Sequence, residues 1–90
     1  MRLDKYLKVA RILKRRTVSK ELAANQRVTI NGKVAKPSTE VRLGDEIEVT
    51  YGERILKVRV LAIAENVRKN EASSMYEILE ERYVPEDLEN

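Results

Sequence analysis

Hydrophobic residues with helical spacing open the chain. Leu3, Leu7 and Ala10 follow one another at intervals of four and three residues, with Tyr6 beside them. This spacing places hydrophobic side chains on one face of a helix. We therefore predict an amphipathic helix over residues 3–10, with Tyr6 turned toward the core.

A second, shorter helix is predicted just beyond. Val18 and Leu22 lie four residues apart, which again defines one helical face. Thr17 is the expected N-cap, because its hydroxyl can accept a hydrogen bond from a free amide of the first turn. Asn25 is expected to end the helix, since asparagine tolerates the left-handed backbone conformation found there.

The pattern then changes to the two-residue period of β-strands. Val28-Thr29-Ile30 alternates, and Asn31-Gly32 after it is a strong hairpin signal, because both turn residues need a positive φ. Pro37 interrupts the pattern, since proline has no amide to donate to a neighbouring strand. Residues 40–43 alternate again and lead into a turn at Gly44-Asp45.

The remaining pattern predicts two strands and a helix. Glu46–Tyr51 alternates with its last residue on the apolar side, which places the Tyr51 ring in the core, and Arg54–Ile63 is predicted to be a long strand with an irregular register. Ser74 to Glu77 matches a capping box, so Met75–Arg82 is predicted to be a short helix. An acidic tail follows at Pro85–Asn90.

These elements predict one domain with an α+β fold. Two N-terminal helices would pack on a small, mostly antiparallel sheet, and a short C-terminal helix would follow it. A chain of 90 residues leaves little room for a second core.

Charge is distributed unevenly along the chain. Residues 1–36 carry eleven lysines and arginines against two acids, a net charge of +9, whereas residues 37–90 carry seven against thirteen, a net charge of −6. Basic residues recur every third position from Arg2 and culminate in Lys14-Arg15-Arg16, just before the second helix. Arginines and the free amides of a helix start both bind phosphate, so this cluster indicates an RNA partner.

Residue types needed for catalysis are largely missing. The chain has no histidine and no cysteine, which removes the commonest general base and metal ligand and excludes disulfides. We therefore expect a non-catalytic protein without a metal or cofactor. The charged opening lacks a signal-peptide pattern and no apolar run could span a membrane, so a cytoplasmic protein is expected.

Several short motifs follow one another in the order of a known RNA-binding family. They are Arg2-Leu3-Asp4-Lys5-Tyr6-Leu7, Arg15-Arg16-Thr17, Arg27-Val28-Thr29-Ile30-Asn31-Gly32 and Gly44-Asp45-Glu46-Ile47. Over residues 2–51 the chain resembles the RNA-binding domain named after the fourth small-subunit ribosomal protein, also called the alpha-L RNA-binding motif. Its short length and later segments are similar to the stand-alone RqcP (YabO) proteins.

This resemblance implies a function and a site. The implied function is binding of 23S rRNA and peptidyl-tRNA on the obstructed large ribosomal subunit, where the protein assists RqcH in alanine tailing during ribosome-associated quality control. The RNA-binding domain would span residues 1–64, with a loop, short helix and acidic tail over 65–90, and the protein would be monomeric off the ribosome. The predicted RNA-binding residues are Arg2, Lys5, Arg11, Lys14, Arg15, Arg16, Lys20, Arg27 and Lys33.

Two other functions fit the same sequence. A general rRNA-binding or ribosome-recycling factor of the heat-shock type would use the same basic half. An adaptor would instead dock a basic protein through its acidic half. Among the tyrosines, Tyr76 beside the predicted helix start is the best candidate to stack on an unpaired base.

Overall fold

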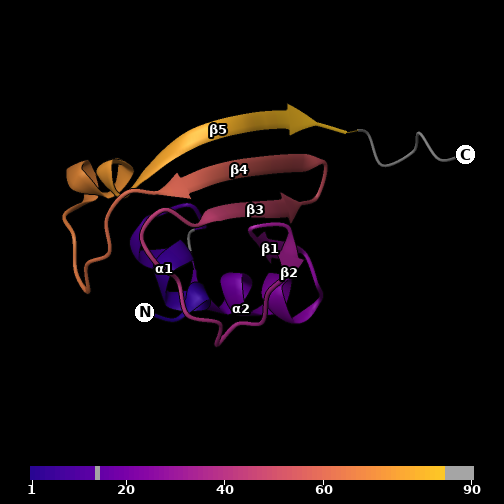
Figure 1. Cartoon of the computed structure of the whole chain (residues 1–90), viewed down its shortest axis with the longest axis horizontal. Coiled ribbons are helices and arrows are strands. Elements are labelled where there is room, and N and C mark those ends of the chain that lie inside the picture. Colours follow the sequence, from indigo (N-terminus) through magenta and orange to yellow (C-terminus); the bar gives the residue numbers. More distant parts are fainter. Residues whose placement is uncertain (14, 85–90) are drawn as a thin grey trace, which may run out of the picture.

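The computed structural model describes residues 1–13 and 15–84. Two α-helices lie against one side of a five-stranded sheet (Figure 1). The elements are α1 (Leu3–Val9), α2 (Arg16–Ala24), β1 (Val28–Ile30), β2 (Lys33–Val34), β3 (Glu46–Tyr51), β4 (Arg54–Val60), the 3₁₀ helix η1 (Lys69–Met75) and β5 (Tyr76–Tyr83). The strand order is β2-β1-β3-β4-β5, and all neighbours are antiparallel. This confirms the predicted α+β fold with two N-terminal helices on an antiparallel sheet.

The core lies between the helices and the inner face of the sheet. Alternate residues of β3 and β4 are buried, as expected for strands covered on one side only. Their partners on α1 are fully buried. The largest side chains of this core are Leu3, Tyr6, Leu7, Val28, Val41, Ile47, Val58, Val60 and Met75.

Tyr6 joins α1 to the far end of the chain. Its side chain is buried, which confirms its predicted place in the core, and its hydroxyl donates a hydrogen bond of 2.7 Å to the carbonyl oxygen of Met75. Burial raises the pKa of the Tyr6 phenol, and the nearby Tyr76 hydroxyl adds to that effect. The backbone amides of Leu61 and Ala62 donate to the same carbonyl, at 2.8 and 3.1 Å. One oxygen thus holds α1, the end of β4 and the end of η1 together.

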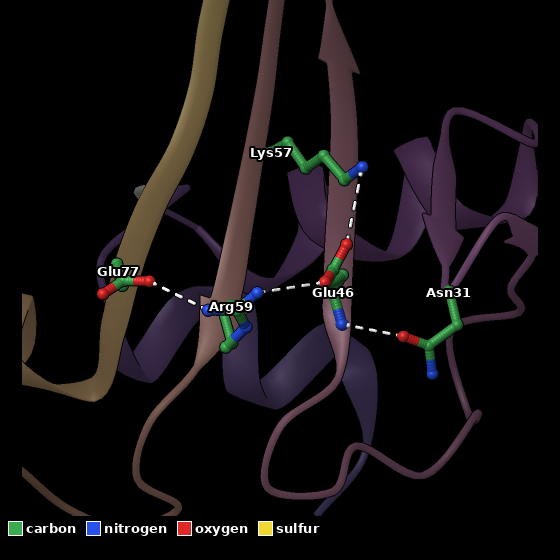
Figure 2. Close-up of polar contacts among 5 residues, drawn as sticks. All are labelled: Asn31, Glu46, Lys57, Arg59 and Glu77. Atoms are coloured by element: carbon green, nitrogen blue, oxygen red, sulfur yellow. Dashed lines mark hydrogen bonds and ion pairs between the residues drawn. The ribbon is translucent and has the colours of Figure 1, made fainter.

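The Asn31-Gly32 hairpin forms as predicted. Both residues have a positive φ, 53° and 84°, which is the conformation that asparagine and glycine tolerate best. The Asn31 side chain also accepts a hydrogen bond of 3.0 Å from the amide of Glu46 (Figure 2). It donates another, also of 3.0 Å, to Asp45. The hairpin is therefore tied to the Gly44-Asp45 turn, where Gly44 has a φ of 87°.

The boundaries of α2 differ from the prediction at both ends. The helix begins at Arg16 with Arg15 as N-cap, so Thr17 lies inside the first turn and is not the cap. Among the side chains that the structure describes, none caps this start, and the Ser19 hydroxyl instead donates to the Arg15 carbonyl at 3.2 Å. A basic turn that enters the helix directly leaves the first amides without a side-chain acceptor, and such amides attract anions.

At its C-terminal end, the predicted left-handed position is one residue too early. Asn25 has a φ of −98° and acts as C-cap, with its side-chain amide donating 2.8 Å to the Glu21 carbonyl. Gln26 takes the left-handed conformation instead, with a φ of 63°. The side-chain bond holds Asn25 near helical geometry, so the reversal falls on the next residue.

The alternating segment at residues 40–43 is not a strand of the sheet. Glu40 forms one isolated bridge to Arg2, and the Val41 amide donates 2.9 Å to the carbonyl of Met1. The segment therefore runs beside the start of α1, where Val41 fills the core. Its alternation reflects one buried side chain rather than a place in the sheet.

The long strand predicted over Arg54–Ile63 ends earlier, at Val60. The amides of Leu61 and Ala62 donate to the carbonyl of Met75 at the end of η1, so these residues no longer pair within the sheet. The irregular register that the sequence suggested lies in the pairing of β4 with β5, where Lys57 faces Glu80 but Val58 faces Ile78. Leu79 is thus an extra residue in β5, and the β3–β4 pairing is regular.

The helix predicted over Met75–Arg82 is wrong, because Met75 ends η1 and all residues after it in this segment belong to β5. Its helical signal rested on three apolar residues, which is weak over so short a length. The free edge of β4 offers seven paired positions, and two cross-strand ion pairs, Arg54–Glu81 and Arg59–Glu77, add to the ladder. These long-range contacts outweigh local propensity. The short helix in this region is η1, which precedes β5, and the acidic tail lies outside the described residues.

Candidate nucleic acid interface

Ion pairs divide the basic residues into two groups. On strands β4 and β5 every basic side chain is paired with a glutamate. Figure 2 shows the centre of this network on the outer face of the sheet, the face away from the helices. The basic residues of these strands are Arg54, Lys57, Arg59 and Arg82.

Glu46 is the hub of that outer face. Its carboxylate lies 3.2 Å from the Arg59 guanidinium and 3.5 Å from the Lys57 ammonium, and Arg59 also reaches Glu77 at 3.2 Å (Figure 2). The hydrogen bond from Arg59 holds the pKa of Glu46 below its usual value, and Lys57 acts in the same direction. The positive charges of this face are therefore largely neutralised within the protein.

The helical side of the molecule is different. Two of its predicted RNA-binding residues form ion pairs, Arg2 with Asp4 and Lys5 with Glu65. Asp4 lies in the first turn of α1 with its side chain only 2% exposed, and it accepts bonds of 3.2 and 3.1 Å from Arg2. The Lys5 ammonium likewise lowers the pKa of Glu65. These two cations have a structural partner before any RNA arrives.

The other basic residues in the range 1–36 whose side chains are described are exposed and carry uncompensated charge. Within residues 1–13 and 15–36, seven basic side chains form neither an ion pair nor a hydrogen bond. Five of them are predicted site residues, and Lys8 and Lys36 were not included although they belong to the same basic half. The seven are Lys8, Arg11, Arg15, Lys20, Arg27, Lys33 and Lys36. An uncompensated cation attracts phosphate more strongly than a paired one.

The side chains of two predicted site residues are outside the described part of the structure. Lys14 lies outside the described residues. Arg16 is the first residue of α2, and only its backbone is described. Arg15, between them, is exposed at the N-cap position with an extended backbone.

A tight turn brings apolar residues next to Arg15. Arg11 has a left-handed φ of 58°, and the amides of Ile12 and Leu13 both donate to the carbonyl of Leu7, at 3.0 and 3.1 Å. This turn closes α1 and packs Ile12 and Leu13 against the edge of the core. The chain then enters α2 through the basic residues.

A groove lies beside this turn, and sequence reasoning did not predict it. It measures about 520 Å³ and runs between the α1–α2 turn and the β3–β4 hairpin. Tyr51, predicted to be a core residue, lines this groove and is 50% exposed, because the helices do not cover the end of β3. Tyr76, predicted to be the stacking residue, packs half-buried against the core instead. The lining residues are Ile12, Leu13, Arg15, Val18, Tyr51 and Arg54.

Comparison with known proteins agrees with this picture. The S4 domain family matches residues 1–47. A Streptococcus pneumoniae protein named RQC P-site tRNA stabilizing factor is 48% identical over 98% of this chain and 100% of its own length. The protein of the same name from Bacillus subtilis is 46% identical over 96% of this chain and 100% of its own length.

A solved structure shows the same fold. The trimeric structure of Heat Shock Protein 15 from Vibrio cholerae has a TM-score of 0.81 and 32% identity, over 87% of this chain and 80% of that one. In the described ranges, no helix of this chain is long and apolar enough to cross a membrane. The matched S4 domain contains the whole basic half, and the sequence similarity to the full-length relatives extends beyond it over nearly the whole chain. The chain belongs to the S4 domain family and, within it, to the family of RQC P-site tRNA stabilizing factors.

Proposed function

We propose that this protein is a non-catalytic RNA-binding factor that holds tRNA in the P site of a large ribosomal subunit during ribosome-associated quality control. In this role it contacts 23S rRNA and the peptidyl-tRNA, and it assists RqcH in adding an alanine tail to the stalled chain. The near full-length similarity to factors named for stabilising P-site tRNA supports the proposal.

One structural observation carries the RNA-binding part of the proposal. Seven exposed cations of the basic half have no acidic partner among the described residues, whereas the cations of β4 and β5 are all paired. When such cations bind RNA phosphates, they displace the counterions condensed on the RNA. We therefore assign the RNA-binding surface to the basic half, and not to the ion-paired outer face of the sheet.

We expect the affinity for RNA to fall steeply with salt. If about four phosphates are contacted, the affinity should drop about a hundredfold between roughly 50 and 200 mM monovalent salt. Fluorescence anisotropy with a labelled RNA hairpin measures this dependence. A DNA duplex of the same length serves as control and should bind more weakly, because A-form shape and 2′-hydroxyls distinguish RNA. Affinity that stays constant with salt would contradict an electrostatic mode.

The quality-control role is tested on ribosomes. We expect the tagged protein to sediment with large subunits that carry peptidyl-tRNA, and the RNA crosslinked to it to be 23S rRNA and tRNA. Deleting the protein should also reduce alanine tailing of a stalled reporter. Normal tailing in its absence would contradict the role with RqcH, while leaving RNA binding intact.

A second candidate function is general rRNA binding of the heat-shock type. The TM-score of 0.81 to Heat Shock Protein 15 favours it. The sedimentation and tailing experiments above separate the two functions, because a heat-shock-type factor would bind ribosomes independently of RqcH. A heat-shock-type factor would still sediment with large subunits from cells without RqcH. In cells that contain RqcH, deleting such a factor would leave tailing of the reporter unchanged.

A further inference from the structure

We propose that the groove beside Arg15 binds one unpaired nucleotide of the RNA, with its base stacked on Tyr51. This inference rests on the proposed RNA-binding function and names the RNA feature that the surface recognises. The site comprises an aromatic ring, an apolar floor and two guanidinium groups. We call it the Tyr51 groove, and its residues are Ile12, Leu13, Arg15, Val18, Tyr51 and Arg54.

Tyr51 is placed as a stacking platform. It stands at the end of β3, on the face where Ile47 and Val49 are buried, yet its own side chain is 50% exposed. The alternation therefore turns its ring toward the helical side, where it stays half-exposed in the groove beside Val18. Aromatic rings of this kind hold unpaired bases, because every base presents a π-face of similar size.

The floor of the groove is apolar and half-buried. Ile12 and Leu13 come from the turn after α1, and Val18 comes from the first turns of α2. A smaller extension reaches Val49 and Leu56 in the core. A volume of about 520 Å³ lies in the range of small-molecule sites and leaves room for a base together with its sugar.

The two arginines distinguish the occupant from an apolar peptide. Arg15 is exposed, and its side chain has no acidic partner in the described part of the chain. Arg54 faces Tyr51 across the β3–β4 pair, and its Nε donates to Glu81 at 2.7 Å, which holds the guanidinium at the groove. A nucleotide matches the ring and the guanidinium groups, because its flat base can stack on the ring and its anionic phosphate can bind the arginines. The groove is also continuous with the basic turn that binds phosphate.

Two hairpins test the proposal, one with a single bulged 2-aminopurine and one with the same base paired. We expect the wild-type protein to bind the bulged hairpin more tightly and to quench its fluorescence. Tyr51→Leu, which keeps an apolar side chain but removes the ring, should weaken binding of the bulged hairpin about tenfold. It should leave the paired hairpin unaffected. Tyr51→Phe should bind as the wild type does.

Tyr83→Ala is the matched control. Tyr83 is 67% exposed and lies in the same row of the sheet, opposite Arg54, but does not line the groove. Its loss should change neither affinity. Thermal unfolding of each variant shows whether it is folded, and Tyr51→Phe provides a second substitution at the same position.

The outcomes separate this inference from the proposed function. If Tyr51→Leu binds the bulged hairpin as tightly as the wild type does, the groove does not hold a base, although RNA binding stands. If the wild type binds neither hairpin, the RNA-binding function fails as well. If Tyr51→Leu only abolishes self-association in sedimentation equilibrium, the groove joins copies of this chain and the inference is overturned.

Discussion

Replacing Arg15 and Arg16 together by alanine is expected to lower the affinity for the large ribosomal subunit about a hundredfold. Each side chain can make one charge-assisted hydrogen bond to phosphate, worth about 1.5 kcal/mol or roughly tenfold in affinity. Arg15 is exposed at the start of α2 and has no acidic partner in the described part of the chain, so its guanidinium is available to a phosphate. Co-sedimentation with purified large subunits at fixed salt measures the effect.

The variant Arg59→Ala/Arg82→Ala is its charge-matched control. It removes the same number of positive charges, but from side chains that are already bound to glutamates on the sheet. We expect its binding to change less than threefold. Equal losses for both double variants would mean that net charge alone drives binding, and an unfolded Arg15/Arg16 variant would mean that the turn is structural. In cells, the Arg15/Arg16 variant should also lose tailing of the stalled reporter.

Tyr6→Ala is expected to destabilise the protein most, by about 3–5 kcal/mol. The ring is fully buried between α1 and the sheet, and its hydroxyl joins α1 to the carbonyl of Met75. Loss of the ring leaves a cavity that the surrounding side chains fill only in part. For a domain of this size, each kcal/mol lowers the melting temperature by about 4–8 °C. Thermal unfolding followed by circular dichroism measures the change.

Tyr6→Phe separates the hydrogen bond from the packing. It should cost only about 1 kcal/mol, because the Met75 carbonyl keeps the amides of Leu61 and Ala62 as donors. Tyr83→Ala, at an exposed position, should stay within about 0.5 kcal/mol of the wild type. A loss for Tyr6→Phe as large as for Tyr6→Ala would assign the stability to the hydroxyl rather than the ring.

The fold was most predictable where the residue types of a short segment determine its conformation without contacts from elsewhere. Asn31-Gly32 adopts positive φ at both positions because these residue types tolerate it, whatever lies around them. The first helix followed from its periodic apolar residues, whose burial the structure confirms for Leu3, Tyr6 and Leu7. The family motifs likewise lie within single elements and turns, which is why they pointed to the S4 domain without a structure.

Prediction failed where distant segments compete for the same residues. Residues 75–82 carry a weak helical pattern, but all of them after Met75 lie in β5, because β4 presents a free edge and oppositely charged partners. Thr17 fits a helix cap by type, yet the helix begins before it at Arg16. For β5, a local preference of about 1 kcal/mol or less is outweighed by several contacts made elsewhere in the fold. For Thr17, the residue type alone does not fix where the helix begins.

The candidate site shows the same division. The sequence alone determined that positive charge gathers in residues 1–36, since composition does not depend on folding. Only the tertiary structure decided which cations are paired. The strand register places Glu46 and Glu77 beside Arg59, whereas Arg15 has no acidic partner within the ranges 1–13 and 15–84. The tertiary structure also decided that Tyr51 is exposed. Alternation predicts the face of a sheet on which a side chain lies, but a side chain is buried only where another element covers that face.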